Sequence, residues 1–175
     1  MKYRIVLLFD NSDKQKIIDL NKQINQGINP DIIFNSTCIP HITLASGYLK
    51  HDIETVNNVI QNSIYLLTTP ILETTTLEYS DDGEWLFINV AKTNDLENFI
   101  VNLRQNLTSC FDMSERRKTH ITIAKSKCLQ NRNNLIKNLQ IPKEINVSGV
   151  AIGVSGEYGT LVNIEKFFKI KTNKK

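Results

Sequence analysis

The sequence is poor in cysteine and contains no long apolar run. Its three cysteines, Cys38, Cys110 and Cys128, are scattered and form no CxxC pair, so we expect free thiols in a reducing compartment and no disulfide framework. The longest apolar run near the start, Ile5–Phe9, is too short for the core of a signal peptide or for a membrane span. These two absences predict a cytoplasmic protein that makes no membrane contact.

Motifs of several enzyme classes are also missing. The chain has no GxxxxGK[ST] loop, with which an ATP-driven ligase would hold its nucleotide, and no elbow motif around a nucleophilic serine. Its histidines lack the HxxxH spacing of a zinc site and have no cysteine cluster beside them. We therefore expect neither a metal ion nor a cofactor.

The chain lacks a strong charge of either sign. Its formal net charge is +3, which argues against a protein held on long nucleic acid mainly by neutralising phosphates. A short anionic ligand is compatible with this charge. We expect a small nucleotide, or a short RNA, as the partner and no obligatory protein partner.

What is present predicts one folded domain. An apolar content of 41% over 175 residues is enough for a core, and no linker interrupts the chain before its Lys/Asn-rich end. We expect a single domain over residues 1–171 and a flexible tail over residues 172–175.

Hydrophobic patterns divide this domain into two similar halves. Ser12 is the expected cap of the first helix. The first half is predicted to run strand, helix, strand, helix, strand over Tyr3–Phe9, Asp13–Gln26, Ile39–Ala45, Asp52–Leu67 and Ile71–Tyr79.

The second half is predicted to repeat this order after a turn at Ser80–Gly83. Its helix after the first strand starts at Asn94 or Asp95. Its other elements are the strand Trp85–Ala91, the strand Thr119–Ala124, the helix Asn131–Leu139, and the strands Ile145–Val154 and Leu161–Ile170, which a Gly-rich turn joins. The predicted fold class is therefore α+β, with two lobes and an approximate internal twofold.

One five-residue motif occurs twice. The chain reads HITLA at His41–Ala45 and HITIA at His120–Ala124. Because successive residues of a strand point to opposite faces, each copy places its histidine and threonine on one face and the two Ile or Leu residues that follow them on the other. Apolar packing explains the aliphatic residues but not a histidine repeated on the open face, so we interpret the repeat as functional.

Two histidines and two threonines around one cleft suit phosphoryl transfer. With a pKa near 6.5, one imidazole can take a proton from a nucleophile while the other, protonated, gives a proton to the leaving oxygen. Each threonine hydroxyl can donate a hydrogen bond to an anionic oxygen. His41, Thr43, His120 and Thr122 are thus the predicted catalytic residues, and this chemistry requires no metal.

The two motifs, HITL and HITI, resemble the H-x-T-Φ pair of the two-histidine (2H) phosphoesterases. This superfamily includes 2′-5′ RNA ligase-like proteins, cyclic phosphodiesterases and viral enzymes that degrade signalling nucleotides. The resemblance implies a bilobal fold in which antiparallel sheets line a central cleft, and it implies that the four motif residues are catalytic. The chain departs from many RNA ligase-like members at Lys125, where they carry arginine.

Four further residues are predicted to bind substrate. Lys125 lies five residues after His120, so it reaches a phosphate only if the strand bends; otherwise it is a solvated lysine at a strand end. Trp85 either stacks on a base or is buried in the core. Tyr158 lies in the Gly-rich turn, and Tyr3 begins the first strand.

Two groups of residues near the motifs are weaker candidates. Arg116, Arg117 and Lys118 either draw an anion inward or form a plain charged loop. His51 lacks a threonine two residues later, and we expect it to face solvent.

These observations favour an enzyme that cleaves a phosphodiester without metal. The preferred substrate is a cyclic dinucleotide such as cGAMP, or a 2′-5′ oligoadenylate, in which a ribose hydroxyl can attack the neighbouring phosphate. The Asn/Ile/Lys-rich composition suits an AT-rich viral genome, which would make the role removal of a host immune messenger. The alternatives are a 2′,3′-cyclic phosphodiesterase or 2′-5′ RNA ligase-like enzyme that processes RNA ends, and a non-catalytic nucleotide-binding module.

Overall fold

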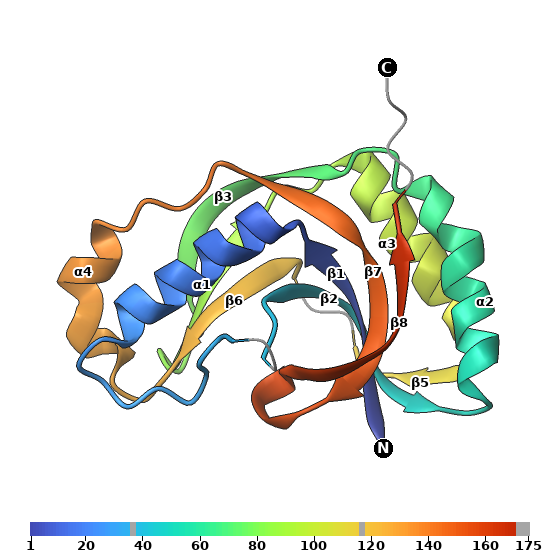
Figure 1. Cartoon of the computed structure of the whole chain (residues 1–175), viewed down its shortest axis with the longest axis horizontal. Coiled ribbons are helices and arrows are strands. Elements are labelled where there is room, and N and C mark those ends of the chain that lie inside the picture. The colour runs from blue at the N-terminus through green and yellow to red at the C-terminus, as the bar shows by residue number, and fades with distance from the viewer. Residues whose placement is uncertain (36–37, 116–117, 171–175) are drawn as a thin grey trace.

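The structure, a computed structural model, describes residues 1–35, 38–115 and 118–170 (Figure 1). Its strands are β1 (Lys2–Phe9), β2 (His41–Leu49), β3 (Ile71–Tyr79), β4 (Trp85–Val90), β5 (Phe111–Met113), β6 (His120–Lys125), β7 (Glu144–Ser155) and β8 (Leu161–Lys169). Its helices are α1 (Asn11–Asn25), α2 (Ile53–Ser63), α3 (Asn94–Leu107) and α4 (Asn133–Lys137), with short 3-10 turns η1 (Ile64–Leu66), η2 (Leu129–Arg132) and η3 (Glu157–Gly159). The tail predicted for residues 172–175 lies outside the described residues.

Antiparallel pairing closes six of the strands into a ring. β1 pairs with β2, β2 with β6, β6 with β4, β4 with β3, β3 with β7, and β7 returns to β1. β5 pairs with β2, and β8 pairs with β7. Because β2–β6 and β3–β7 join strands from different halves of the sequence, the two halves are interleaved in space.

The ring of pairs keeps the internal twofold of the sequence. Exchanging β1 with β4, β2 with β6 and β3 with β7 maps every pair of the ring onto a pair of the ring. The irregularities also correspond: the β1–β2 ladder skips Leu44, and the β4–β6 ladder skips Ile123, in each case the residue after the motif threonine. The structure confirms the predicted α+β class with two repeated halves.

Strand alternation orients both motifs as predicted. Ile42 and Ile121 pair with each other between β2 and β6, and both are fully buried. Leu44 and Ile123 are buried as well. Burial of these aliphatic residues in the core leaves the histidines and threonines on the other face of the two strands.

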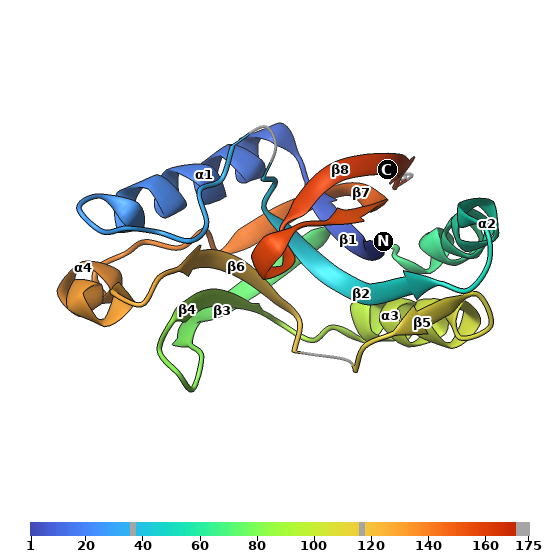
Figure 2. The same ribbon diagram turned by 90° about the horizontal axis from the view of Figure 1, so that it is seen from below.

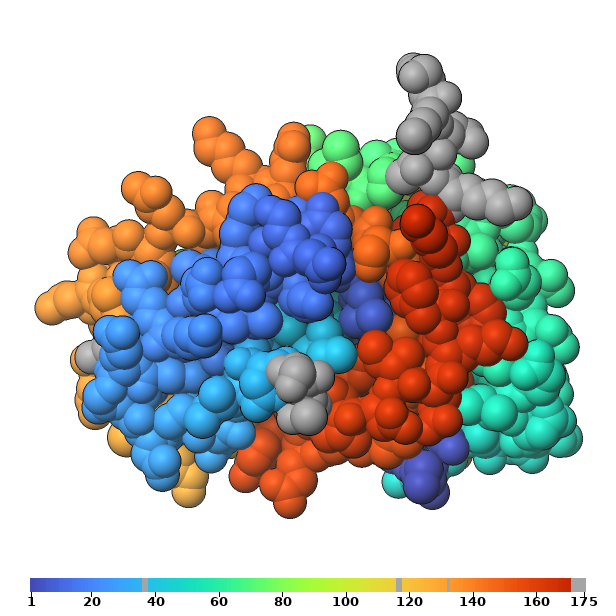
Figure 3. All heavy atoms as spheres, viewed as in Figure 1, coloured from blue at the N-terminus to red at the C-terminus, as the bar shows by residue number. Residues whose placement is uncertain are grey.

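The helices pack at two ends of the ring. α1 and α4 lie at one end and α2 and α3 at the other, with β2 and β6 between them (Figures 1 and 2). α1 contacts β6, and α3 contacts β2, so each motif strand is covered by a helix from the other half. On the face shown in Figure 3, α1, the loop after it and β8 form much of the surface. Among the described residues, each helix is too short or too polar to span a bilayer.

The first helix begins earlier than the sequence predicted. The cap is Asp10, and not Ser12, because the Asp10 carboxylate accepts a hydrogen bond from the backbone N–H of Asp13 at 2.8 Å. Asp52 caps α2 in the same way. The strand β5 was not predicted, since three residues are too few to show an alternation, and its pairing with β2 carries that strand on to Leu49.

Candidate active site

The four motif residues, His41, Thr43, His120 and Thr122, line one cavity of about 620 Å³, which we call the cleft. Ile42 lies opposite Ile121 in the antiparallel pair β2–β6, so the antiparallel direction places His41 on the side of Thr122 and Thr43 on the side of His120. The structure therefore brings together two imidazoles that lie far apart in the sequence.

The same contact orients both imidazoles. Nδ1 of His41 lies 2.7 Å from the carbonyl oxygen of Ile39, and Nδ1 of His120 lies 2.8 Å from the carbonyl oxygen of Lys118. A carbonyl only accepts hydrogen bonds, so Nδ1 is the donor in each ring. In a neutral ring Nε2 is then the basic nitrogen, and each ring has one defined atom for proton transfer.

The electrostatic surroundings of the two rings differ. The pKa of His41 is lowered to about 4, first by burial and then by the charges of Arg4 and His120, against hydrogen bonds with the backbone of Ile39 and Gly159 that raise it. His41 is therefore neutral at pH 7. On the other side Glu78 lines the cleft; hydrogen bonds from Asn89 and Lys118 lower its pKa, and the charge of His120 adds to this effect.

Arg4 is a residue of the cleft that sequence reasoning missed. Its Nη1 donates to Oγ1 of Thr43 at 2.8 Å, and its Nε donates to Oγ of Ser155 at 3.0 Å. Gly159 passes so close that a Cβ there would lie 2.2 Å from Nη2 of Arg4. The guanidinium therefore supplies a fixed positive charge beside the first motif. A charged residue within the otherwise apolar first strand was the available signal, but the sequence did not show that this strand pairs with the strand of the first motif.

Three aromatic side chains line the cleft, and we call them the aromatic wall: Trp85, Phe87 and Tyr158. The centroid of the Phe87 ring lies 4.3 Å from that of His120. Trp85 lies two residues before Phe87 on the same face of β4, at 6.2 Å with nearly parallel rings. Tyr158 is 46% exposed and meets Trp85 edge-on at 6.5 Å. The structure thus places Trp85 and Tyr158, two of the predicted substrate-binding residues, in the lining of the cleft, and Phe87 was missed within an apolar strand.

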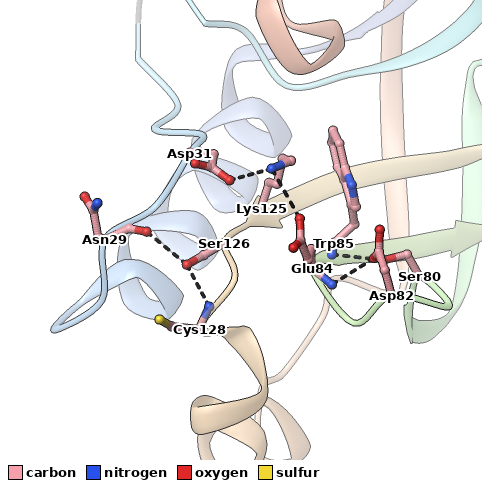
Figure 4. A network of polar contacts seen from close by, with 9 residues as sticks. All are labelled: Asn29, Asp31, Ser80, Asp82, Glu84, Trp85, Lys125, Ser126 and Cys128. Carbon is pink, nitrogen blue, oxygen red and sulfur yellow. Dashed lines mark hydrogen bonds and ion pairs between the residues drawn. The ribbon is translucent and has the colours of Figure 1, made fainter.

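Lys125 lies behind the aromatic wall. Within the described part of the chain it is not one of the residues that line the cleft. Its ammonium lies 2.5 Å from Asp31 and 3.7 Å from Glu84 (Figure 4), and 4.2 Å and 5.4 Å from the ring centroids of Tyr158 and Trp85. Lys125 is only 8% exposed, so the solvated lysine considered from the sequence is wrong.

The other candidates are spread around the molecule. Lys118 lines the cleft. Tyr3 and His51, which the structure also describes, do not line the cleft. Tyr3 is half-buried against the core and His51 is exposed. Arg116 and Arg117 lie outside the described residues.

The described residues contain no group of three or more His, Cys, Asp or Glu side chains that could hold a metal ion. The cysteines are unpaired: Cys38 is half-buried, Cys110 buried and Cys128 exposed. Burial raises the pKa of the Cys38 thiol to about 11, so this thiol is protonated at neutral pH and unreactive.

Comparisons with known proteins give a fold. No family model and no curated protein matches the sequence. Among solved structures, TT0787 of Thermus thermophilus superposes with a TM-score of 0.67 at 13% identity, over 99% of this chain and 100% of that chain. Escherichia coli LigT complexed with NADP+ gives a TM-score of 0.65 at 12% identity, over 97% of both chains. A third structure, described as a phosphoesterase, gives 0.57 at 12% identity, over 98% of both chains. The chain therefore has the fold of the two-histidine phosphoesterases.

Proposed function

We propose that this protein is a metal-independent phosphodiesterase that cleaves a small signalling nucleotide by acid–base catalysis with two histidines. The observation that carries the proposal is the arrangement of His41 and His120, whose rings line one cleft and hold Nδ1 on a backbone carbonyl in the same way. LigT was solved in complex with phosphate and with NADP+. We propose that this chain likewise takes a nucleotide that carries phosphate.

The reaction begins with a free ribose hydroxyl beside the scissile phosphate. His41, neutral at pH 7, takes the hydroxyl proton on Nε2 as the oxygen attacks phosphorus. A new O–P bond forms, the bond from phosphorus to the 5′ oxygen breaks, and protonated His120 gives a proton to that oxygen. The broken bond leaves a 2′,3′-cyclic phosphate on one side and a 5′ hydroxyl on the other; these two ends lie on separate products of a linear oligoadenylate and on one linear molecule when a cyclic dinucleotide is opened. The two rings have then exchanged protonation states, and solvent restores them.

Polar groups beside His41 stabilise the charge on the phosphate. Arg4 donates to Oγ1 of Thr43, so the threonine oxygen acts as an acceptor there and its own proton is free for a non-bridging oxygen. Thr122 offers a second hydroxyl from the other motif. The guanidinium adds positive charge where negative charge develops, which is the arrangement that lowers a phosphoryl-transfer barrier.

The shape of the cleft favours a small ligand with a base. Its volume of about 620 Å³ falls in the range of small-molecule sites, roughly 300–1,000 Å³. The aromatic wall offers a stacking surface for a base beside His120. These features support a short nucleotide over a long RNA.

Within this class we propose a cyclic dinucleotide such as cGAMP, or a 2′-5′ oligoadenylate. Both carry a ribose hydroxyl next to a phosphodiester, so both can supply the internal nucleophile. The biological role would be removal of a host immune messenger by a viral protein in the cytoplasm. The unpaired cysteines agree with a reducing compartment.

A substrate panel tests this function. The protein is incubated with EDTA and with 2′-5′ oligoadenylate, cGAMP, 3′-5′ cyclic dinucleotides, or RNA that ends in a 2′,3′-cyclic phosphate. We expect cleavage of a signalling nucleotide to a cyclic phosphate end, abolished by His41→Ala and by His120→Ala. His51→Ala is the matched control, because His51 is exposed outside the cleft, and it keeps full activity.

Two results would overturn the proposal. Turnover of the RNA end alone would assign the protein to RNA processing. Tight binding of a nucleotide without turnover of any panel member would make it a nucleotide-binding module.

A further inference from the structure

Each motif strand has a bulge directly after its histidine and threonine. Leu44 has no partner in β1, and Ile123 has no partner in β4. Each bulged residue lies three positions after a histidine. A bulge bends a strand and interrupts its ladder, and a slip of one residue would turn every side chain to the other face. The direction of both imidazoles therefore depends on what fixes the two bulges.

Arg104 holds the first bulge. From α3 its Nη1 donates to the carbonyl oxygen of Leu44 at 3.1 Å, and its Nη2 donates to the carbonyl oxygen of Ser114 at 2.8 Å. Leu44 and Ser114 both line the cleft. One planar guanidinium thus joins the strand of His41 to the segment that follows β5.

Asn21 holds the second bulge. From α1 its Nδ2 donates to the carbonyl oxygen of Ile123 at 2.7 Å and to that of Ile32 at 3.2 Å. Its Oδ1 accepts the backbone N–H of Phe34 at 3.0 Å. Asn21 is fully buried, and Ile32 and Phe34 line the cleft. This amide thus joins the strand of His120 to the loop that follows α1.

The two contacts obey the internal twofold. Asn21 lies ten residues after Asn11, the first residue of α1, and Arg104 lies ten residues after Asn94, the first residue of α3. Each helix belongs to one half of the sequence and holds the bulge of the other half. Two different side chains, an amide and a guanidinium, make the same kind of bond at equivalent positions, which indicates that the bond itself is what the position requires.

We propose that Asn21 and Arg104 are positioning residues, which fix the direction of His120 and His41 respectively by binding the carbonyl of the bulge that follows each motif. The inference deepens the proposed function and rests on it. Neither side chain takes part in proton transfer. Each keeps an Nε2 atom within reach of the reacting oxygens, where an error of about 1 Å can cost on the order of 100-fold in rate.

Matched variants test this role. Asn21→Ala removes the bond to Ile123 together with those to Ile32 and Phe34. Asn25→Ala removes a bond to the carbonyl of Ile32 from the same helix at 3.0 Å and leaves the bond to Ile123 in place. On a cleaved panel substrate, Asn21→Ala is expected to lower kcat by about 10- to 100-fold. KM changes little, because the aromatic wall is untouched. Asn25→Ala is expected to stay near wild type in both.

The same comparison applies to the first bulge. Arg104→Met is expected to lower kcat by about 10- to 100-fold, as for Asn21→Ala. Gln105→Ala, a replacement of the exposed neighbouring residue, is the control. Arg104→Lys is expected to recover part of kcat, because an ammonium can still donate to the carbonyl of Leu44. If Asn21→Ala fails to fold, as judged by circular dichroism, the Arg104 series decides alone.

Histidine ring spectra test the role without a substrate. The chain has three histidines, so ring 1H–15N NMR signals can be assigned by single replacements. Arg104→Met is expected to shift the His41 signals and to leave those of His120 and His51 in place. Asn21→Ala is expected to shift the His120 signals alone. If the variants merely loosened the fold, each would shift the signals of more than one histidine.

The outcomes separate the two proposals. A wild-type protein that cleaves nothing, but shows the paired shifts, overturns the function and keeps the positioning. A wild type that cleaves, with variants equal to their controls in kcat and in ring signals, overturns the positioning and keeps the function. Variants that shift both catalytic rings alike also overturn the positioning.

Discussion

The two halves of the cleft present the same motif to different neighbours. His41 lies in the half of Arg4, whose guanidinium contacts Thr43. His120 contacts the ring of Phe87 and lies in the half where β4 lines the cleft. On the far side of each bulge from the motif histidine, Arg4 of β1 pairs with β2 and Trp85 of β4 pairs with β6. Arg4 and Trp85 therefore occupy equivalent positions in the two halves. A cation in one half therefore stands where the other half has an aromatic ring.

What the two halves share fixes the positions of the two imidazoles, and what differs between the halves distinguishes their roles. The repeated strands, bulges and carbonyl contacts fix where the two imidazoles lie. The neighbours then distinguish them: the charge of Arg4 disfavours a proton on His41, while the carboxylate of Glu78 interacts favourably with a proton on His120. A duplicated motif can thus supply a base and an acid without any change in its own residues.

The largest expected effect comes from the two histidines themselves. Replacement of His41 or His120 by Ala should each lower kcat by about 10²- to 10⁴-fold. With a substrate whose 5′ bridging oxygen is replaced by sulfur, the leaving thiolate needs no proton. His120→Ala should then regain activity and His41→Ala should not, because only the base is still required. Rescue of His41→Ala instead would reverse the two roles; initial rates on both substrates decide.

The next effect comes from Arg4. Arg4→Met should lower kcat by about 10²-fold, because a preorganised positive charge beside the phosphate is lost. It should also raise the pKa of His41, since the charge of Arg4 lowers it, and so move the acidic limb of the kcat/KM profile to higher pH. Lys22→Met, which removes an exposed cation outside the cleft, is the control. An unchanged acidic limb would contradict the distinction drawn between the halves.

A smaller effect is expected from the support behind the aromatic wall. Lys125→Met leaves Asp31 and Glu84 without their shared cation. The free energy of unfolding should fall by about 1 to 3 kcal/mol, less than for a fully buried pair because the carboxylates are about a third exposed. Lys22→Met, which breaks an exposed pair with Asp19, should cost under about 1 kcal/mol. Urea unfolding measures both, and equal losses would contradict a supporting role for Lys125.

The last expected effect concerns the pH dependence of stability. His41 has a folded pKa of about 4, against roughly 6.5 when unfolded. Between these values the unfolded chain binds more protons, so stability is lost as the pH falls from 6.5 toward 4. His41→Gln should make this loss shallower, whereas His51→Gln should leave it unchanged. Urea midpoints at pH 7 and pH 4.5 measure it, and parallel losses in both variants would refute the lowered pKa.

Local patterns carried much of the fold. The alternation in HITLA and HITIA correctly predicted that the Ile and Leu side chains of both motifs enter the core, because it depends only on neighbours along the strand. The motif alanines are buried as well, which alternation alone did not predict, because each follows the bulge. The strand Ile71–Tyr79 was predicted at the bounds that the structure shows. The strand at His41 was predicted to end at Ala45 but runs to Leu49. β1 pairs with it as far as Tyr48 and β5 as far as Leu49, and no local pattern predicts either partner.

The missing parts of the site depend on contacts between distant segments. Arg4 enters the cleft only because β1 pairs beside β2, and Arg104 and Asn21 matter only because helices cross onto strands of the other half. Lys125 is buried by residues from three separate segments. No pattern within any one segment reveals such a partner, so these residues look ordinary in the sequence alone.

The ring of strands has a consequence for a chain cut between its halves. A break in the turn Ser80–Gly83 would yield two pieces, each with one of the two motif imidazoles. The pairs β2–β6, β3–β7 and β7–β1 all join strands of different pieces, so neither piece can complete the ring by itself. Nucleotide turnover would then return only on mixing, and the protein would serve as a split enzyme that reports the reunion of its fragments.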